Sequence, residues 1–124
     1  MLFAFVGCGN SRDVVLVGVW QYEASWGTFT TYEFNRNGTG TRTWYSPAIR
    51  DFDSMEFIYE FTWNTEDDNF IVMVFTGVHF EGDFHEYEDE EESYFYYSLS
   101  FGGRRLTFYD WYELDSQTFV RIEN

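Results

Sequence analysis

The sequence FTTYEFNRNGTGTRTWY, residues 29–45, predicts two antiparallel strands joined by a tight turn. Residues 29–35 (FTTYEFN) alternate aromatic and polar side chains, and residues 40–45 (GTRTWY) are rich in threonine and aromatic residues, which are compositions typical of strands. Residues 36–38 (RNG) lie between them, and asparagine and glycine readily adopt the positive φ angles of a hairpin turn. The stretch therefore favours an all-β fold built from hairpins.

The same pattern recurs along the rest of the chain. The other expected strands are residues 16–23 (LVGVWQYE), 55–64 (MEFIYEFTWN), 69–76 (NFIVMVFT), 94–101 (YFYYSLSF), 104–111 (RRLTFYDW) and 118–123 (TFVRIE). A meander of about eight strands exposes two edges unless it closes, and eight is a number that closes around a small interior. We therefore expect an antiparallel up-and-down β-barrel with almost no helix; an open sandwich is the alternative.

Two short motifs resemble the opening of the bacterial lipocalin-like families. Residues 16–20 (LVGVW) match an L-x-G-x-W strand, and residues 32–40 (YEFNRNGTG) match a Y-x-F strand with a turn that ends G-T-G. The resemblance implies a small lipocalin-like (calycin-type) barrel, with Gly18, Trp20 and Arg121 closing its base. There an arginine over the indole face would gain cation–π attraction and cap the apolar base. The alternative is that Trp20 is an ordinary core residue.

The composition excludes several classes of function. The chain carries 22 acidic residues against seven arginines and no lysine, which gives a net charge of −15. A field of this sign repels phosphate backbones and anionic lipid headgroups, so we expect no nucleic-acid partner and no membrane contact except through a lipid anchor. The same self-repulsion favours a monomer. Because lysine is absent, Schiff-base chemistry on lysine is excluded.

The first residues resemble the end of a bacterial lipoprotein signal. Residues 1–9 (MLFAFVGCG) place an apolar run and a small residue before Cys8, and polar residues 10–13 (NSRD) follow. In such signals the cysteine is lipidated, although a charged region usually precedes the apolar run. We therefore expect residues 1–13 to be a signal remnant and tether and residues 14–124 to be the barrel domain. The protein would then lie in the cell envelope, as an outer-membrane or periplasmic lipoprotein, or be secreted; the alternative is a buried thiol.

The strongest functional signal is the supply of aromatic residues, which make up 24% of the chain. If the apolar strand faces point inward, they line a lumen for a small hydrophobic or aromatic ligand, which tyrosine hydroxyls would orient. The residues expected on those faces are Tyr32, Phe34, Phe57, Tyr59, Phe61, Trp63, Phe95, Tyr97, Leu99, Leu106 and Phe108. An equally open alternative is that these rings fill the barrel and leave a scaffold whose loops bind a protein or an extracellular polymer.

Residues 78–93 (VHFEGDFHEYEDEEES) hold both histidines and a dense run of acids. The weak candidate metal ligands in this stretch are His79, Glu81, Asp83 and His85. At about 3.3 Å per residue the two histidines of an extended chain lie roughly 20 Å apart, so only a neighbouring pair, or a loop that folds back at Gly82, would share an ion. We expect no bound metal, and we expect residues 86–92 (EYEDEEE) to form a solvated loop, because seven arginines cannot neutralise 22 acids.

No motif in the sequence indicates catalysis. No serine occupies a G-x-S-x-G nucleophile elbow, and the glycine-rich residues 37–40 and 102–103 are expected to be hairpin turns without a following helix to cradle phosphate. We therefore predict a protein that is not an enzyme, needs no cofactor and binds a small hydrophobic ligand inside a secreted or membrane-anchored barrel.

Overall fold

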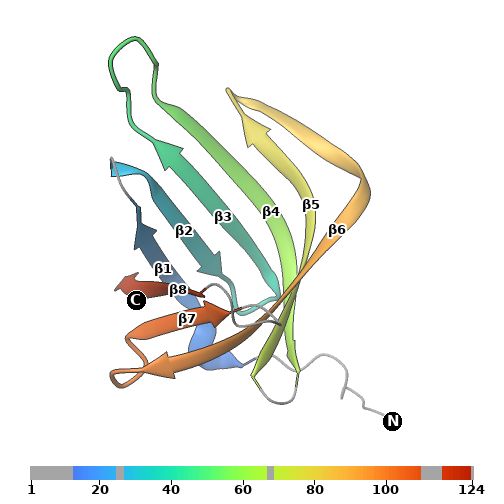
Figure 1. Ribbon diagram of the computed structural model, residues 1–124. Helices are drawn as coiled ribbons and strands as arrows, with labels where there is room; N and C mark the ends of the chain where they lie inside the picture. The colour runs from blue at the N-terminus through green and yellow to red at the C-terminus, as the bar shows by residue number, and fades with distance from the viewer. Residues whose placement is uncertain (1–12, 25–26, 67–68, 110–115, 124) are drawn as a thin grey trace.

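The computed structural model describes residues 13–24, 27–66, 69–109 and 116–123. Within these residues eight antiparallel strands follow one another in sequence order, and β1 pairs with β8 to close the barrel (Figure 1). The strands are β1 (Gly18–Glu23), β2 (Phe29–Phe34), β3 (Thr39–Ser46), β4 (Met55–Glu66), β5 (Phe70–Phe80), β6 (Asp83–Ser100), β7 (Arg105–Tyr109) and β8 (Ser116–Glu123). The predicted up-and-down barrel is confirmed, and the open sandwich is wrong.

The strands alternate between the interior and the solvent, as the sequence pattern predicts. On β2, for example, Tyr32 and Phe34 are buried, whereas Glu33 between them is exposed. Gly40 on β3 is required by close packing, because a Cβ atom there would lie 2.6 Å from the ring of Phe61 on β4. The missing side chain on one strand therefore makes room for a large ring on its neighbour.

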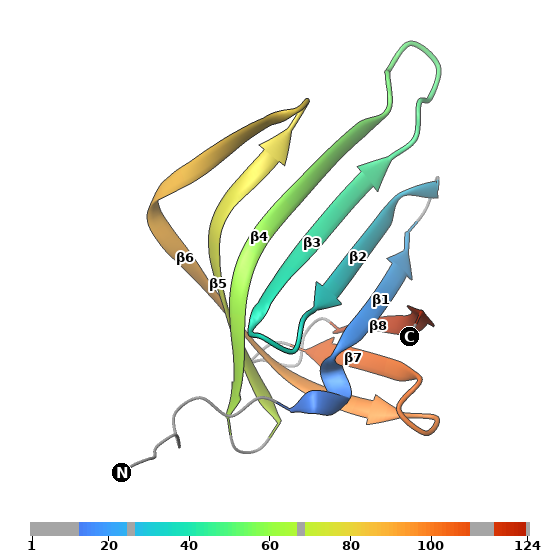
Figure 2. The same cartoon turned by 180° about the vertical axis from the view of Figure 1, so that it is seen from behind.

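The hydrophobic core lies toward one end of the barrel, hereafter the closed end. At this end β1 begins, β4 turns into β5 and β6 turns into β7 (Figures 1 and 2). The core residues are Leu16, Trp20, Tyr32, Phe34, Phe61, Trp63, Ile71, Met73, Tyr97, Leu106, Phe108 and Phe119. Trp63 also ties β4 to the β2–β3 turn, because its indole N–H lies 3.1 Å from the carbonyl oxygens of both Asn35 and Thr39. The closed end is thus packed with rings whose polar atoms are satisfied.

The barrel closes between β1 and β8, where the ladder has only three residue pairs and its register is irregular next to Trp20. The guanidinium carbon of Arg121 lies 4.2 Å from the centroid of the Trp20 ring, so the predicted contact is confirmed. Arg121 also donates hydrogen bonds to the carbonyl oxygens of Val17 at 2.9 Å and Val15 at 2.6 Å. The Trp20 indole N–H donates to the Leu16 carbonyl at 2.9 Å. These contacts reinforce a short seam.

Gly18 begins the strand at this seam and has a φ of +138°. L-residues with a side chain rarely adopt such a backbone conformation, whereas glycine does so readily. The glycine of the L-x-G-x-W motif is therefore a backbone requirement at the point where the chain enters the barrel.

A short 3₁₀ turn, η2 (Val14–Leu16), precedes β1 and is not among the predicted elements. The predicted first strand, residues 16–23, begins instead at Gly18. Asp13 caps the turn and accepts a 2.8 Å hydrogen bond from the Tyr97 hydroxyl, which fastens the turn to β6. In the part of the chain that the structure describes, no helix is long and apolar enough to cross a membrane. Cys8, the predicted lipid attachment site, lies outside that part.

Residues 86–92 belong to β6, so the predicted loop is wrong, although the acidic side chains are exposed as expected. The strand predicted at residues 94–101 is only the second half of this element. The cause is β5, which runs on to Phe80 and turns back through residues 81–82, so that its last residues pair with the start of β6. Pairing with β5 satisfies the backbone N–H and C=O groups of β6, while the carboxylates of its side chains remain in water.

A large bulge bends β6 at its middle (Figure 1). Phe75 pairs with Glu91 and Gly77 pairs with Glu86, so one residue on β5 lies opposite residues 87–90 on β6. Extra residues on one strand of a pair leave the ladder, bend that strand and redirect their side chains. The bulge therefore separates the outer part of the β5–β6 hairpin from the part that belongs to the barrel wall.

We expect Arg121→Met to lower the free energy of unfolding by about 2–4 kcal/mol, because it removes the cation–π contact and three charge-assisted hydrogen bonds but keeps the aliphatic stem. The measurement is urea denaturation followed by tryptophan fluorescence. The control is Arg105→Met, since Arg105 is exposed and covers only the Phe101 ring, at 4.5 Å. The control should cost less than about 1 kcal/mol, and equal losses in both variants would contradict the role of Arg121.

Candidate functional site

Two neighbouring cavities lie at the end of the barrel opposite the closed end, hereafter the mouth. The larger, of about 510 Å³, is lined by Tyr22, Tyr32, Phe95, Phe108, Tyr109, Ser116 and Gln117. The smaller, of about 330 Å³, is lined by Tyr32, Arg42, Tyr59, Phe75, Tyr87, Glu91, Ser93, Phe95 and Gln117. Tyr32, Phe95 and Gln117 line both, so the two cavities share a wall. Both volumes fall in the range of pockets that hold small molecules.

Arg42 lies on the inner face of β3, in register with Tyr32 on β2 and Tyr59 on β4. Its guanidinium carbon lies 5.4 Å from the centroid of the Tyr59 ring and 6.0 Å from that of Tyr32. Both distances are within the range of cation–π attraction, so the two rings hold the cation from neighbouring strands. A positive group is thereby fixed in the wall of a cavity in a strongly acidic protein.

Tyr32 joins the cavities to the core. Its ring stacks on Phe34 with centroids 5.6 Å apart and meets Phe108 and Phe119 edge to face at 5.4 and 5.3 Å. Burial raises the pKa of the Tyr32 hydroxyl, while the charge of Arg42 and its hydrogen bonding to Tyr32 partly oppose this effect. Because packing on several sides restricts the ring, Tyr32 forms a rigid floor beneath both cavities.

The bulge of β6 supplies one rim of the smaller cavity. Tyr87, inside the bulge, and Glu91, directly after it, both line this cavity. Tyr87 is half-buried, and burial followed by the charge of Glu91 raises the pKa of its hydroxyl. The bulge therefore turns a tyrosine from an otherwise acidic, exposed stretch toward the lumen.

The structure distributes the predicted lumen residues over three regions. Those that line the cavities are Tyr32, Tyr59, Phe95 and Phe108. Those that belong to the core or pack against it without lining a cavity are Phe34, Phe61, Trp63, Tyr97, Leu99 and Leu106. Phe57 lies farther out on β4. The interior is thus filled at the closed end and hollow at the mouth, and ligand binding by the cavity residues stays a prediction.

An aromatic ladder continues the inner face beyond the cavities, where β3, β4 and β5 extend past the shorter strands (Figure 2). Phe57 pairs with Trp44 on one side and with Phe80 on the other. The Phe57 and Phe80 rings stack with centroids 4.5 Å apart, and the Trp44 ring lies 5.8 Å from that of Phe57. Cross-strand ring pairs of this kind stabilise a sheet where it has no core beneath it.

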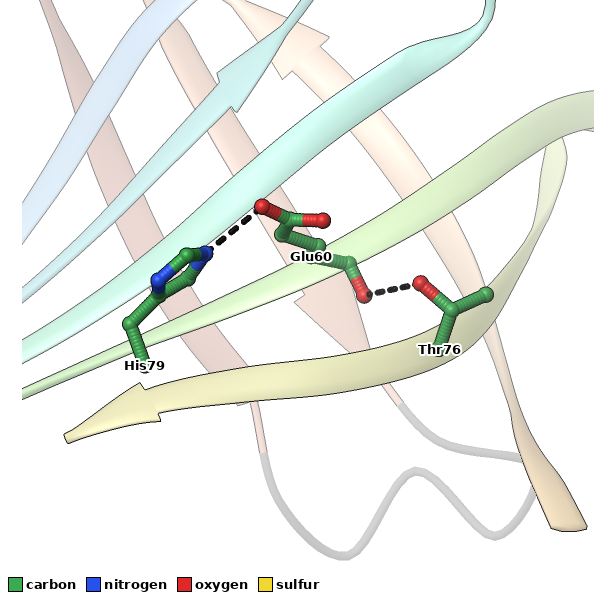
Figure 3. Close-up of polar contacts among 3 residues, drawn as sticks. All are labelled: Glu60, Thr76 and His79. Atoms are coloured by element: carbon green, nitrogen blue, oxygen red, sulfur yellow. Dashed lines mark hydrogen bonds and ion pairs between the residues drawn. The ribbon is translucent and has the colours of Figure 1, made fainter. Parts of the chain in front are cut away.

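His79 lies on the outer face of the barrel, where its Nε2 atom is 2.7 Å from Oε2 of Glu60 (Figure 3). The Thr76 hydroxyl donates to the Glu60 carbonyl at 3.4 Å, and the His79 ring lies 4.6 Å from that of Phe84. The weak candidate ligands are divided between β5 (His79), the turn (Glu81) and β6 (Asp83 and His85). Within the described residues, no three histidine, cysteine or acidic side chains are grouped to hold a metal.

Sequence reasoning missed nine of the described cavity residues, which are Tyr22, Arg42, Phe75, Tyr87, Glu91, Ser93, Tyr109, Ser116 and Gln117. One signal was available, because Gly40, Arg42 and Trp44 share one face of β3. A glycine and a tryptophan on that face favour an inward direction for Arg42 as well. No comparable signal exists for Tyr87 and Glu91, since only the bulge places them at the cavity.

Comparison with known proteins adds no relative: no family model, no curated protein and no solved structure matches this chain. The geometry of the mouth therefore carries the functional argument.

The raised pKa of Tyr32 predicts a loss of stability in alkali. The folded protein holds the phenol proton of Tyr32 more tightly than the unfolded chain does. The protonated hydroxyl therefore contributes to the free energy of unfolding below about pH 10, and this contribution is lost as the pH rises through the folded-state pKa. We expect Tyr32→Phe to lose less free energy of unfolding than the wild type between about pH 9.5 and 11.5. Urea denaturation at each pH measures the difference. Identical pH profiles would contradict the prediction.

Proposed function

We propose that this protein binds a small aromatic molecule in the mouth of a lipocalin-like barrel and that it acts as a carrier and not as an enzyme. The observation that carries the proposal is the pair of cavities, walled by tyrosine and phenylalanine, above a core that is already filled. Aromatic walls favour a flat apolar ligand, and hydroxyl and amide groups at the rim give it orientation.

The filled closed end limits where a ligand can sit. Trp20, Trp63 and Phe34 occupy that half of the barrel and are essentially inaccessible to solvent. A ligand must therefore enter from the mouth and lie above Tyr32, with one edge near solvent. This position suits a compact ring system better than a long alkyl chain, which needs a deep lumen.

The composition of the cavity walls supports binding over catalysis. The described lining contains two serines, Ser93 and Ser116, but no histidine, cysteine or lysine. A serine without a neighbouring base remains a weak nucleophile. The proposal includes a monomeric, secreted or envelope-anchored protein, with a lipid at Cys8 as the anchor and no cofactor.

The alternative, a scaffold that works through its loops, has less support. Its expected sign is an exposed aromatic patch beside a solid core. The most exposed rings belong to the β3–β4 loop, the two halves of β6 and the β6–β7 turn, and they are Phe52, Phe84, Tyr94 and Phe101. These positions are scattered over the molecule and form no single surface.

We expect N-phenyl-1-naphthylamine, a neutral dye whose fluorescence rises in apolar surroundings, to bind saturably with one site per chain. Gln117→Trp should weaken this binding by about tenfold or more, since Gln117 lines both cavities and a bulky indole there occupies their shared wall. Fluorescence titration measures both affinities.

The matched control is Thr118→Trp, one residue along β8. Thr118 is exposed, and its hydroxyl lies 3.0 Å from that of Thr107. Its side chain therefore lies on the face of β8 opposite to that of Gln117. The control should change the affinity for the dye by less than about twofold, because its indole points away from the lumen. Absence of saturable binding, or equal effects of the two variants, would refute a ligand site in the mouth.

A further inference from the structure

Arg42 and Arg121 both lie on the inner side of the barrel, but their guanidinium groups have different partners. Arg121 donates hydrogen bonds to the carbonyl oxygens of Val15, Val17 and Gly103, which occupy its guanidinium. The only ion pair found among the described residues joins His79 to Glu60, so no described carboxylate lies within 4.0 Å of the Arg42 guanidinium. The chain has 22 acidic residues, yet Arg42 forms no ion pair with any carboxylate that the structure describes.

The position of Arg42 keeps the cation available to a ligand. Its guanidinium is held by two tyrosine rings and lines the smaller cavity, and the side chain is only half-buried. Guanidinium presents several N–H donors in a planar fork that matches the two oxygens of a carboxylate. Ring contacts fix the direction of the fork, and the hydrogen bonding of Arg42 to the Tyr32 hydroxyl uses only part of its five N–H donors.

Most of the polar groups around Arg42 can donate a hydrogen bond to an anion. The cavity wall also carries the hydroxyl groups of Tyr59, Tyr87 and Ser93 and the amide of Gln117. Glu91 is the one carboxylate among the described lining residues, and its exposure at the rim leaves it screened by solvent. The balance of the wall therefore favours an oxyanion over a cation.

We propose that the mouth recognises an aromatic carboxylate, whose ring lies against Tyr32, Phe95 and Phe108 and whose carboxylate receives hydrogen bonds from Arg42. This inference rests on the proposed function and adds the chemical class of the ligand. The larger cavity holds the ring and the smaller one holds the acid group, because the two share a wall at Tyr32 and Phe95. A charge-assisted, two-pronged contact gives both affinity and orientation.

Because the protein carries a large negative charge, a carboxylate ligand needs a local positive group in order to bind, and Arg42 is that group. At −15 the protein repels anions at long range, and no diffuse attraction draws a carboxylate to the mouth. Salt screens that repulsion over roughly 8 Å at physiological ionic strength, whereas a contact in a partly buried site is screened much less. Binding then depends on one local pair, which makes the proposal open to a single-residue test.

The test compares 2-naphthoate with 2-naphthalenemethanol, a neutral probe of similar size and ring system, by calorimetric titration near pH 7. We expect the wild type to bind naphthoate more tightly. Arg42→Gln should weaken naphthoate binding by about tenfold to a hundredfold and leave naphthalenemethanol within about twofold. Arg105→Gln is the matched control, because it removes the same charge from the outside of the barrel, where Arg105 covers Phe101, and should change neither affinity.

The outcomes separate this proposal from the one on which it rests. If neither probe nor the neutral dye binds, both proposals fail. If the neutral probes bind but naphthoate binds no better, or if Arg42→Gln weakens both naphthalene probes equally, only the carboxylate proposal is overturned and the aromatic site stands. An equal effect of Arg105→Gln would assign the preference to bulk charge and also overturn it. If Arg42→Gln does not fold, Arg42→Lys decides, because it keeps the charge, removes the planar fork and should weaken naphthoate alone.

Discussion

The seam between β1 and β8 is the constraint on which the rest of the structure depends. A meander has an inside only when its first and last strands pair, and here that pairing is a short, irregular ladder. Arg121 strengthens it by covering the Trp20 ring and by binding carbonyl oxygens of the segment that leads into β1. Arg121 on the last strand thus binds the residues that lead into the first strand, so the closure connects the two ends of the described sequence.

Closure also explains why the interior divides into a filled half and a hollow half. The rings of Trp20, Trp63 and Phe61 are buried at the closed end, where glycine at position 40 leaves room for the Phe61 ring. At the other end the strands have unequal lengths, and β3 to β6 extend past their neighbours (Figure 1). A wall that is incomplete on one side cannot be filled by facing side chains, so space remains above Tyr32.

The sequence predicted the parts of this fold that follow from alternation, and it missed those that follow from register. Strand positions and barrel closure were predictable because a period of two and short turns leave few alternatives, whereas the Arg121–Trp20 contact was implied only by the resemblance to the lipocalin-like families. The acidic residues 86–92 looked like a loop, since charged residues have low strand propensity, yet pairing with β5 overrides that preference. Arg42 was missed because its charge suggests solvent, although Trp44 on the same face points to the interior.

The distribution of charge connects the fold to the proposed ligand. The acids of β6 lie on the exposed part of a strand whose backbone is paired, so their repulsion acts on the solvent side and costs the fold little. Arg42 lies inside, between two tyrosine rings, where water competes less for its charge. A net charge of −15 repels other anions at long range, whereas a single interior cation acts only on a molecule small enough to enter the mouth. In the proposed function the two signs of charge would select at different steps: the exterior would repel highly charged anions, and the lumen would select a ligand by its shape and by one oxyanion.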